Sequence, residues 1–343
     1  MSGLRESPCS IHRQCGACDL IRETESDQLE GKVQLIEQRL RRKISSAYAS
    51  PLSLHYRARV HLRVTENGRV CYFRPRTHLE VPVERCEIAR PEINVVIKRL
   101  PALPRGSESV ELRSNGSSVI VVVHAKRKQS RYVEKHLRDW DFPKLGIHGL
   151  YVNKHHVYGI KRTVIDVMGV EHRIGPSTFY QVNLEINQLL VMEVNRIVEE
   201  YNPSAVLDLF SGAGNLSLPL AKEGRTITMM ESNIDAVAEA KATAKRIGAT
   251  VDARQFDATR YRAGDAFFEV AILDPARAGA AGVMQELAVT RPRAIVYVAC
   301  NPQAFQRDSK EVERWGYHLK DLALFDMFPQ TSHTELMGVF ELN

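Results

Sequence analysis

AVLDLFSGAGN, residues 205–215, joins a short apolar run to a turn of small residues. Small residues at such a turn let the backbone pass close to a ligand. Two features of phosphate-binding loops are missing, because Ser217 stands where a third glycine would complete the dinucleotide fingerprint and no lysine follows as in a P-loop. The next apolar run ends in Glu231, whose carboxylate can accept hydrogen bonds from both ribose hydroxyls of an adenosine. The pattern favours a nucleoside-containing cofactor without a pyrophosphate.

Apolar runs and helical stretches alternate regularly after residue 177. The runs that predict strands are 205–209, 226–230, 250–256, 270–273 and 294–299. The stretches that predict helices are 215–222, 234–247, 281–289 and 302–315. This alternation is typical of an α/β fold with a mostly parallel, doubly wound sheet. Two last runs, 317–325 and 335–342, have no helix between them and predict an antiparallel hairpin at one edge.

Residues before 178 follow a different pattern. Helical spacing at 24–43 predicts an amphipathic helix, with Thr24 as its cap. Apolar and cationic residues then alternate over 54–64, which predicts a strand with one apolar and one cationic face. The cationic row is His55, Arg57, Arg59, His61 and Arg63. A turn at Asn67-Gly68 and further strands at 70–73, 118–124, 149–158 and 164–168 predict a smaller β-rich domain.

Charge divides the chain in the same place. Residues 1–177 hold 31 Lys and Arg against 19 Asp and Glu, a formal charge of +12, and the remainder carries −6. A basic part joined to an acidic part favours a polyanionic partner such as a nucleic acid, although a solvated basic surface is the alternative. The predicted domains are 1–53, a cysteine-bearing segment with a helix; 54–177, the β-rich domain; and 178–343, the α/β domain. No apolar run approaches a membrane span or a signal core, so a cytoplasmic protein without membrane association is expected.

Six segments occur in the order found in RNA uridine C5 methyltransferases, and the chain resembles that family over essentially its whole length. They are TFYQVN, LDLFSGAGN, Glu231, LDPARAG, YVACNP and DMFPQTSHTE. The resemblance implies a Rossmann-like S-adenosylmethionine-dependent methyltransferase domain beside a β-rich RNA-binding domain. The cofactor contacts that it implies are Gln181, Phe210, Asn215, Glu231 and Asp274, with Asp257 as a candidate for the adenine edge. Ordinary polar caps are the alternative for Gln181 and Asn183.

Cys300 follows an apolar strand and precedes Asn301-Pro302, which opens a helix. In an open parallel sheet, this position faces the ligand-binding crevice, and nearby helix N-termini are expected to favour the thiolate. A lone cysteine at a strand end is otherwise a small buried hydrophobe. The resemblance implies that Cys300 is the nucleophile that adds to carbon 6 of uracil, and that Glu335 is the base that removes the carbon 5 proton. The target uridine should be unpaired or flipped out.

Four further cysteines suggest a metal site. Cys9, Cys15 and Cys18 form C-x5-C-G-A-C, and Cys86 follows later. In a reducing compartment this pattern indicates a metal rather than disulfides, and the spacing leaves zinc and a [4Fe–4S] cluster open. The resemblance to the iron–sulfur branch of the family implies a [4Fe–4S] cluster, although Ala17 replaces the second glycine of C-G-G-C. Cys71, within an apolar strand, is expected to be a core residue.

The resemblance leaves the RNA class open. Cluster cysteines without room before Cys9 for an additional small β-barrel domain favour 23S ribosomal RNA. The T-loop of transfer RNA is the alternative, and a catalytically inert RNA-binding or assembly factor is the alternative from a different class. No obligate protein partner is implied.

Overall fold

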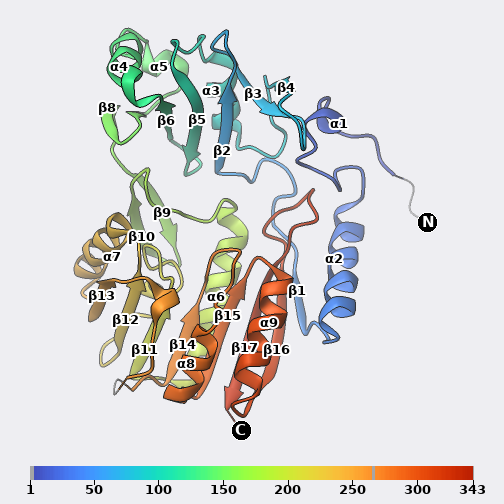
Figure 1. Cartoon of the computed structure of the whole chain (residues 1–343), viewed down its shortest axis with the longest axis vertical. Helices are drawn as coiled ribbons and strands as arrows, with labels where there is room; N and C mark the ends of the chain where they lie inside the picture. The colour runs from blue at the N-terminus through green and yellow to red at the C-terminus, as the bar shows by residue number, and fades with distance from the viewer. Residues whose placement is uncertain (1–3, 265–266, 343) are drawn as a thin grey trace.

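The computed structural model describes residues 4–264 and 267–342, in which a seven-stranded sheet lies above an eight-stranded one (Figure 1). The larger sheet has the order β1-β16-β17-β15-β14-β11-β12-β13. Its strands are β1 (Ser46–Tyr48), β11 (Ala205–Leu209), β12 (Thr226–Glu231), β13 (Val251–Gln255), β14 (Val270–Leu273), β15 (Ala294–Ala299), β16 (Tyr317–Phe325) and β17 (Glu335–Leu342). The strands from β13 to β15 are parallel, which confirms the predicted α/β fold.

The predicted hairpin is formed by β16 and β17, and β17 also pairs antiparallel with β15. It lies at one end of the sheet, but β1 pairs in parallel with β16 and forms the outermost strand. A segment from the beginning of the chain therefore completes the sheet beside its last two strands.

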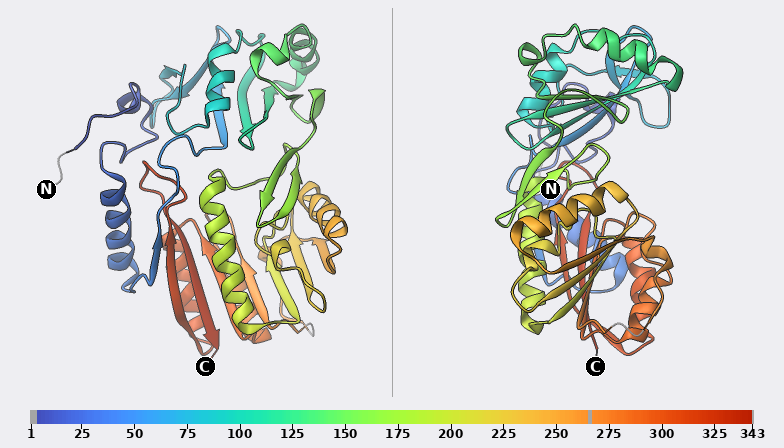
Figure 2. Two further views of the ribbon diagram at one scale, coloured as in Figure 1. Left: turned by 180° about the vertical axis from the view of Figure 1, so that it is seen from behind. Right: turned by 90° about the vertical axis from the view of Figure 1, so that its left-hand side faces the viewer.

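Helices cover both faces of the larger sheet (Figure 2). One face packs against α6 (Leu184–Tyr201) and α7 (Ile234–Ile247). The other packs against α2 (Glu25–Leu40), α8 (Val283–Thr290) and α9 (Pro302–Glu313). Alternate residues of β15 enter the two cores, which explains its unbroken apolar sequence.

One predicted helix is absent. Residues 215–222 form turns and a single 3₁₀ turn, η2 (Leu218–Leu220), instead of the expected α-helix. Pro219 has no backbone N–H to donate, and the chain turns again at Gly224, where φ is +77°. Too few residues lie between the glycine-rich turn and Gly224 for a stable helix to form.

The smaller sheet has the order β4-β3-β2-β5-β6-β7-β8. Its strands are β2 (Arg59–Val64), β3 (Val70–Phe73), β4 (Glu80–Pro82), β5 (Ser107–Ser114), β6 (Val119–Ala125), β7 (Gly149–Val152) and β8 (His155–Gly159). The predicted turn at Asn67-Gly68 joins β2 to β3, with Gly68 at φ +77°. Regular pairing of β2 begins only at Arg59, because Arg57 bridges Ala89 and Asn183 instead.

The apolar face of the smaller sheet packs against the short helices α3 (Pro91–Arg99), α4 (Ser130–Leu137) and α5 (Phe142–Leu145). Val60 and Leu62 enter this core, whereas His61 and Arg63 lie on the opposite, exposed face. The alternation predicted for this strand is therefore confirmed where the strand is regular.

Segments near the predicted domain limits pack against the larger sheet. The ribbon of β9 (Thr163–Val167) and β10 (Val170–Ile174) contributes to the same core as α6 and α7. Helix α2 packs on the opposite face, and its cap is as predicted, since the Thr24 hydroxyl accepts a hydrogen bond from the Asp27 N–H at 3.2 Å. The domain limits themselves stay a prediction. None of the described helices has the length and apolar character needed to span a membrane.

Candidate active site

The glycine-rich turn after β11 has a strained backbone with open space on one side. Phe210, Gly212 and Gly214 have φ values of +61°, +54° and +87°. A Cβ atom at Gly214 would lie 2.6 Å from the Leu218 side chain, whereas one at Gly212 would meet nothing within 4 Å. Packing therefore requires a glycine at 214, while Gly212 borders free space at the carboxyl end of the strand.

Glu231 is held beside this turn by three hydrogen bonds. Its Oε2 accepts from the Gly212 N–H at 3.1 Å, and its Oε1 accepts from the Asn233 N–H at 2.6 Å and from the Ser232 hydroxyl at 3.1 Å. The carboxylate is only partly buried. A fixed carboxylate next to open space matches the predicted acceptor for ribose hydroxyls.

Two side-chain amides make hydrogen bonds near the ends of β11 and β14. Asn215 exchanges hydrogen bonds with Asn187 of α6, at 2.8 and 2.9 Å. Gln181 donates to Asp274 Oδ2 at 3.4 Å. Asn183 is the N-cap of α6 and accepts from the Ile186 N–H at 3.3 Å, so the alternative of a polar cap holds for that residue.

Asp257 follows β13, the outermost strand on the other side of the larger sheet. The end of β13 is joined to β12 by a hydrogen bond from the Phe256 N–H to the Glu231 carbonyl at 2.8 Å. Asp257 is exposed, and its Oδ1 accepts from the Thr259 N–H and hydroxyl as the cap of the 3₁₀ turn η3 (Ala258–Arg260). It thus serves as a local cap at the same edge of the sheet as Glu231.

Sheet register brings the two predicted catalytic residues together. Ala299, the last residue of β15, pairs with Leu336 near the start of β17. Cys300 follows the first and Glu335 precedes the second, so both lie at the same end of two adjacent strands. Asp274 follows the neighbouring strand β14, whose last residue Leu273 pairs with Tyr297. The Cys300 thiol and the carboxyl groups of Glu335 and Asp274 therefore lie at the same end of three adjacent strands.

The pKa of Cys300 is raised, although the sequence predicted that its thiolate would be favoured. Burial, followed by the negative charges of Glu335 and Asp274, raises the pKa of the Cys300 thiol to about 11, and Arg277 opposes this only in part. The expectation that nearby helix N-termini favour the thiolate is wrong for the ligand-free chain. Burial also raises the pKa of Asp274 to about 7, and burial and Asp274 raise the pKa of Glu335 well above its ordinary value.

Three residues of this site were not predicted from the sequence. Asn187 gave no signal, because its partner Asn215 lies on a different element. Arg277 stands within the LDPARAG motif but was not singled out. Asp208 lies within the predicted strand 205–209 but was not singled out; it is 1% exposed, and burial raises its pKa to about 7, which the Ser217 hydroxyl opposes only in part.

The predicted metal ligands line one separate cavity of about 170 Å³. Cys9, Cys15 and Cys18 come from the N-terminal segment, which includes the single turn α1 (His12–Cys15), and Cys86 comes from the β-rich part. Burial and the neighbouring thiols raise the pKa of Cys18 to about 12. Among residues 4–264 and 267–342, no three His, Cys, Asp or Glu side chains converge closely enough to hold a single metal ion.

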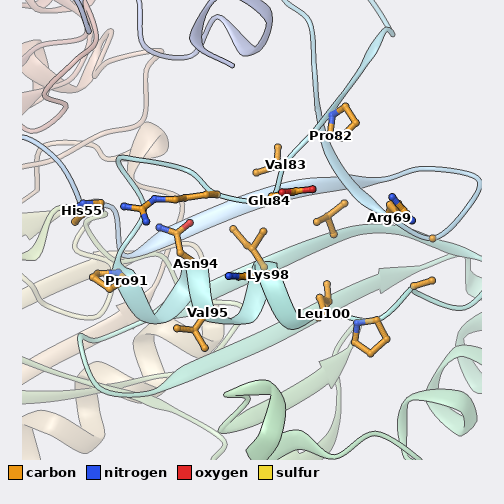
Figure 3. A pocket seen from close by; sticks show the side chains of 16 residues that line it. His55, Arg69, Pro82, Val83, Glu84, Pro91, Asn94, Val95, Lys98 and Leu100 are labelled. Atoms are coloured by element: carbon orange, nitrogen blue, oxygen red, sulfur yellow. The ribbon is translucent and has the colours of Figure 1, made fainter. Parts of the chain in front are cut away.

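Two broad grooves hollow the β-rich part, away from Cys300. One, of about 910 Å³, lies between α3 and the segment after β4 (Figure 3). Lys98 and Asn94 of α3 line it together with Arg69 and Glu84. The other, of about 990 Å³, is lined by more cationic residues, namely Arg63, Arg105, Lys126, Arg127 and Lys128.

Comparison with known proteins identifies relatives of the whole chain. Residues 231–342 match the family model described as tRNA (Uracil-5-)-methyltransferase. The 23S rRNA (uracil(1939)-C(5))-methyltransferase RlmD of Vibrio campbellii is 30% identical, over 97% of this chain and 81% of that protein. The enzyme of the same name from Shewanella woodyi is 32% identical, over 98% and 82%.

A solved structure shares the overall fold. The tRNA (uracil-54, C5)-methyltransferase of Pyrococcus abyssi, in complex with S-adenosyl-L-homocysteine, superposes with a TM-score of 0.79 at 23% identity, covering 98% of this chain and 87% of that one. The similarity therefore extends through both sheets.

Proposed function

The chain belongs to the RNA uracil-C5 methyltransferase family, and we propose on that basis that it methylates carbon 5 of one uridine in 23S ribosomal RNA. The observation that carries this proposal is the strand register that brings Cys300 and Glu335 to one edge beside Asp274. An inert RNA-binding factor would have no need for that arrangement. We propose the cytoplasm as the setting of this activity, because the proposed substrate is ribosomal RNA.

The residues at this end of the sheet fit S-adenosylmethionine. The Glu231 carboxylate is fixed beside Gly212, where the backbone borders open space, and it can accept from the ribose hydroxyls. Asp208 and Asp274 add negative charge at the ends of β11 and β14, which suits a cationic sulfonium. Bound there, the cofactor supplies an electrophilic methyl group.

Cys300 supplies the covalent step, since carbon 5 of uracil is too weak a nucleophile to accept a methyl group directly. Its sulfur bonds to carbon 6, and the electron pair of the 5,6 double bond passes into an enolate with nucleophilic character at carbon 5. Carbon 5 then takes the methyl group as the bond from the sulfonium breaks. The carboxylates that raise the thiol's pKa also attract the cationic cofactor, whose charge would offset theirs.

Glu335 completes the reaction. Its carboxylate takes the proton from carbon 5, the double bond re-forms, and the bond from carbon 6 to the Cys300 sulfur breaks, which releases the thiolate. Burial raises the pKa of Glu335 well above its ordinary value, which makes this carboxylate a stronger base than an exposed one.

Trapping tests this mechanism. RNA with 5-fluorouridine at the target should form a stable adduct with the protein in the presence of S-adenosylmethionine, because fluorine cannot leave as a proton. Cys300→Ala should abolish the adduct, and Cys71→Ala, at a cysteine buried within β3, should retain it. Absence of an adduct with the unmodified protein would contradict the covalent step.

The RNA class needs its own experiment. The relatives named as 23S rRNA enzymes support ribosomal RNA, whereas the archaeal structure named as a tRNA enzyme shares only 23% identity. Transcripts of 23S rRNA and of transfer RNA should be offered separately, with mass spectrometry to locate 5-methyluridine. Methylation of the T-loop alone would replace the ribosomal proposal by the alternative.

We further propose that Cys9, Cys15, Cys18 and Cys86 hold a [4Fe–4S] cluster that joins the N-terminal segment to the β-rich part. The support for this proposal is that the four thiols line one cavity, while the choice of a [4Fe–4S] cluster over zinc rests on the resemblance of their spacing to the iron–sulfur branch of the family. The methyl transfer described above needs no electron transfer, so the cluster would act as a structural link.

Metal analysis after anaerobic purification checks the cluster. About four iron atoms and matching sulfide per chain are expected, with loss of both in Cys86→Ser and retention in Cys71→Ser. Stoichiometric zinc without iron would contradict the assignment.

A further inference from the structure

The loop that leads to Glu335 is held by the beginning of the chain. This loop, residues 326–334, connects β16 to β17 and ends directly before Glu335. In Figures 1 and 2 it rises from the hairpin toward α2 and the N-terminal segment. Much of it is buried, and Gln330 is 0% exposed. A connection between two antiparallel strands would ordinarily be exposed to solvent.

Gln28 of α2 and Gln330 make the central contact. The Gln330 N–H donates to Gln28 Oε1 at 2.8 Å, and Gln28 Nε2 donates to Gln330 Oε1 at 3.0 Å. The Gln330 carbonyl accepts from the Leu20 N–H at 3.0 Å. Gln330 has a φ of +71°, a conformation that is uncommon for a non-glycine residue.

A buried ion pair holds the first residue of the loop. Lys32 Nζ lies 2.6 Å from Asp326 Oδ1, with the two side chains 1% and 8% exposed, and also donates to the Phe328 carbonyl at 3.1 Å. Farther along, the Ser332 N–H donates to Asp19 Oδ1 at 2.9 Å. Asp19 directly follows Cys18, so the cysteine segment also contacts the loop.

These contacts determine geometry more than they add stability. A buried ion pair contributes little net stability, because desolvation offsets the attraction, but it tolerates few alternative arrangements. The register of β15 and β17 positions Glu335 from one side, and the contacts of Gln28 and Lys32 position the preceding loop from the other.

Resting on the proposed function, we propose that Gln28 and Lys32 are positioning residues for proton abstraction. By holding the loop at Gln330 and Asp326, they place the Glu335 carboxylate against carbon 5 after methyl transfer. Their loss should leave the first half of the reaction, addition of Cys300 and methyl transfer, intact. It should slow the second half, in which the proton leaves and the adduct breaks down.

Two assays separate adduct formation and methyl transfer from proton removal and adduct breakdown. Trapping on 5-fluorouridine RNA reports adduct formation and methyl transfer without proton removal, whereas turnover on ordinary RNA requires both halves. Gln28→Met removes, at similar volume, both hydrogen bonds to Gln330 and also those that Gln28 Nε2 donates to the Leu20 and Glu23 carbonyls at 3.1 Å. We expect a fall in kcat on the order of 10²-fold, since small misplacements of catalytic groups have effects of that size. The trapping rate and the KM for RNA should stay unchanged, and an SDS-resistant adduct should accumulate on ordinary RNA.

Gln34→Met is the matched control, because Gln34 lies on the exposed side of α2 and bonds only to Glu30, at 2.9 Å, among the described residues. It should behave as the unmodified protein does. Lys32→Met should reproduce the Gln28→Met pattern, and Lys32→Arg, which keeps the charge, should restore turnover at least in part. If Gln28→Met does not fold, Gln330→Asn serves instead. Its shorter side chain weakens the hydrogen bond to Gln28, and asparagine tolerates positive φ.

Two results would overturn the proposal. Trapping and turnover falling in proportion would mean that the contacts only hold the crevice together, and a Gln28→Met protein indistinguishable from Gln34→Met would mean that they position nothing. Failure of the proposed function looks different, because the unmodified protein would then neither methylate RNA nor form the trapped adduct.

Discussion

Cys300 occupies an environment that opposes its own ionisation. Its thiol is partly buried, and the carboxyl groups of Glu335 and Asp274 act on it from two adjacent strands. The position of Cys300 directly after a predicted strand was enough to place it at the carboxyl end of the sheet. The carboxylates that surround it come from residues 26 positions earlier and 35 later, so their effect on the pKa followed only from the sheet order.

Alkylation measures this effect at the residue itself. In the ligand-free protein, iodoacetamide should modify Cys300 slowly at pH 7, because a pKa near 11 leaves little thiolate. Glu335→Gln removes the larger of the two charge effects and should move the alkylation profile to lower pH. Mass spectrometry of the Cys300 peptide across the pH range gives the midpoint. An unchanged midpoint in Glu335→Gln would contradict the carboxylate's role, and Glu341→Gln, at the far end of the same strand, serves as the control.

At the scale of elements, periodicity predicted the strands of the larger sheet other than β1, but not helix α6 or strand β5. The strands at 205–209, 270–273 and 294–299, the hairpin and helix α7 occur at the expected residues, because their apolar patterns match the faces they bury. The helix expected at 215–222 is absent, since Pro219 and Gly224 leave it too short. Strand β1 was not anticipated. Its three residues carry no recognisable pattern, and its place in the sheet comes from pairing with β16.

Strand β2 permits a matched test of RNA contact. Arg59 forms hydrogen bonds to Glu111 at 2.9 and 3.2 Å, so its charge is already paired. Arg63 is exposed, makes no ion pair among the described residues and lies over the Phe73 ring at 6.0 Å. Arg63→Ala should therefore lower the dependence of RNA affinity on salt by about one phosphate contact, whereas Arg59→Ala should change it less.

Filter binding over a range of salt concentrations measures both slopes. Equal slopes for Arg63→Ala and the unmodified protein would show that the exposed face of β2 does not meet phosphates. A larger change in Arg59→Ala would mean that the ion pair with Glu111 opens when RNA binds.

Three carboxyl groups with raised pKa values affect the stability of the whole molecule. Asp208, Asp274 and Glu335 lie at the active-site ends of three strands of the larger sheet, where charge is costly without a ligand. In the unfolded chain these groups ionise near pH 4. Between about pH 4 and 7 the folded protein therefore holds more protons than the unfolded chain, so the free energy of unfolding falls as pH rises through this range.

Thermal unfolding of the ligand-free protein should show this loss, with a higher Tm at pH 5.5 than at pH 8. Each unit by which a carboxyl pKa is raised corresponds to about 1.4 kcal/mol. Below pH 4 the trend reverses, because partners such as Arg225 lower the pKa of Glu199 to about 2 and that ion pair is lost as Glu199 gains a proton. Asp208→Asn should reduce the fall in Tm between pH 5.5 and 8, and Asp252→Asn, at an exposed site in β13, should not.

A cationic ligand should counteract the loss of stability that accompanies ionisation of these carboxyl groups. S-adenosylmethionine brings positive charge to the carboxylates, whereas S-adenosylhomocysteine has a neutral sulfur, so the difference in Tm between the two complexes should grow from pH 5.5 to pH 8 as the carboxyl groups ionise. A difference that stays constant with pH would show that the sulfonium binds away from these carboxylates. The negative charge that destabilises the empty crevice would then have no part in selecting the methyl donor over the product.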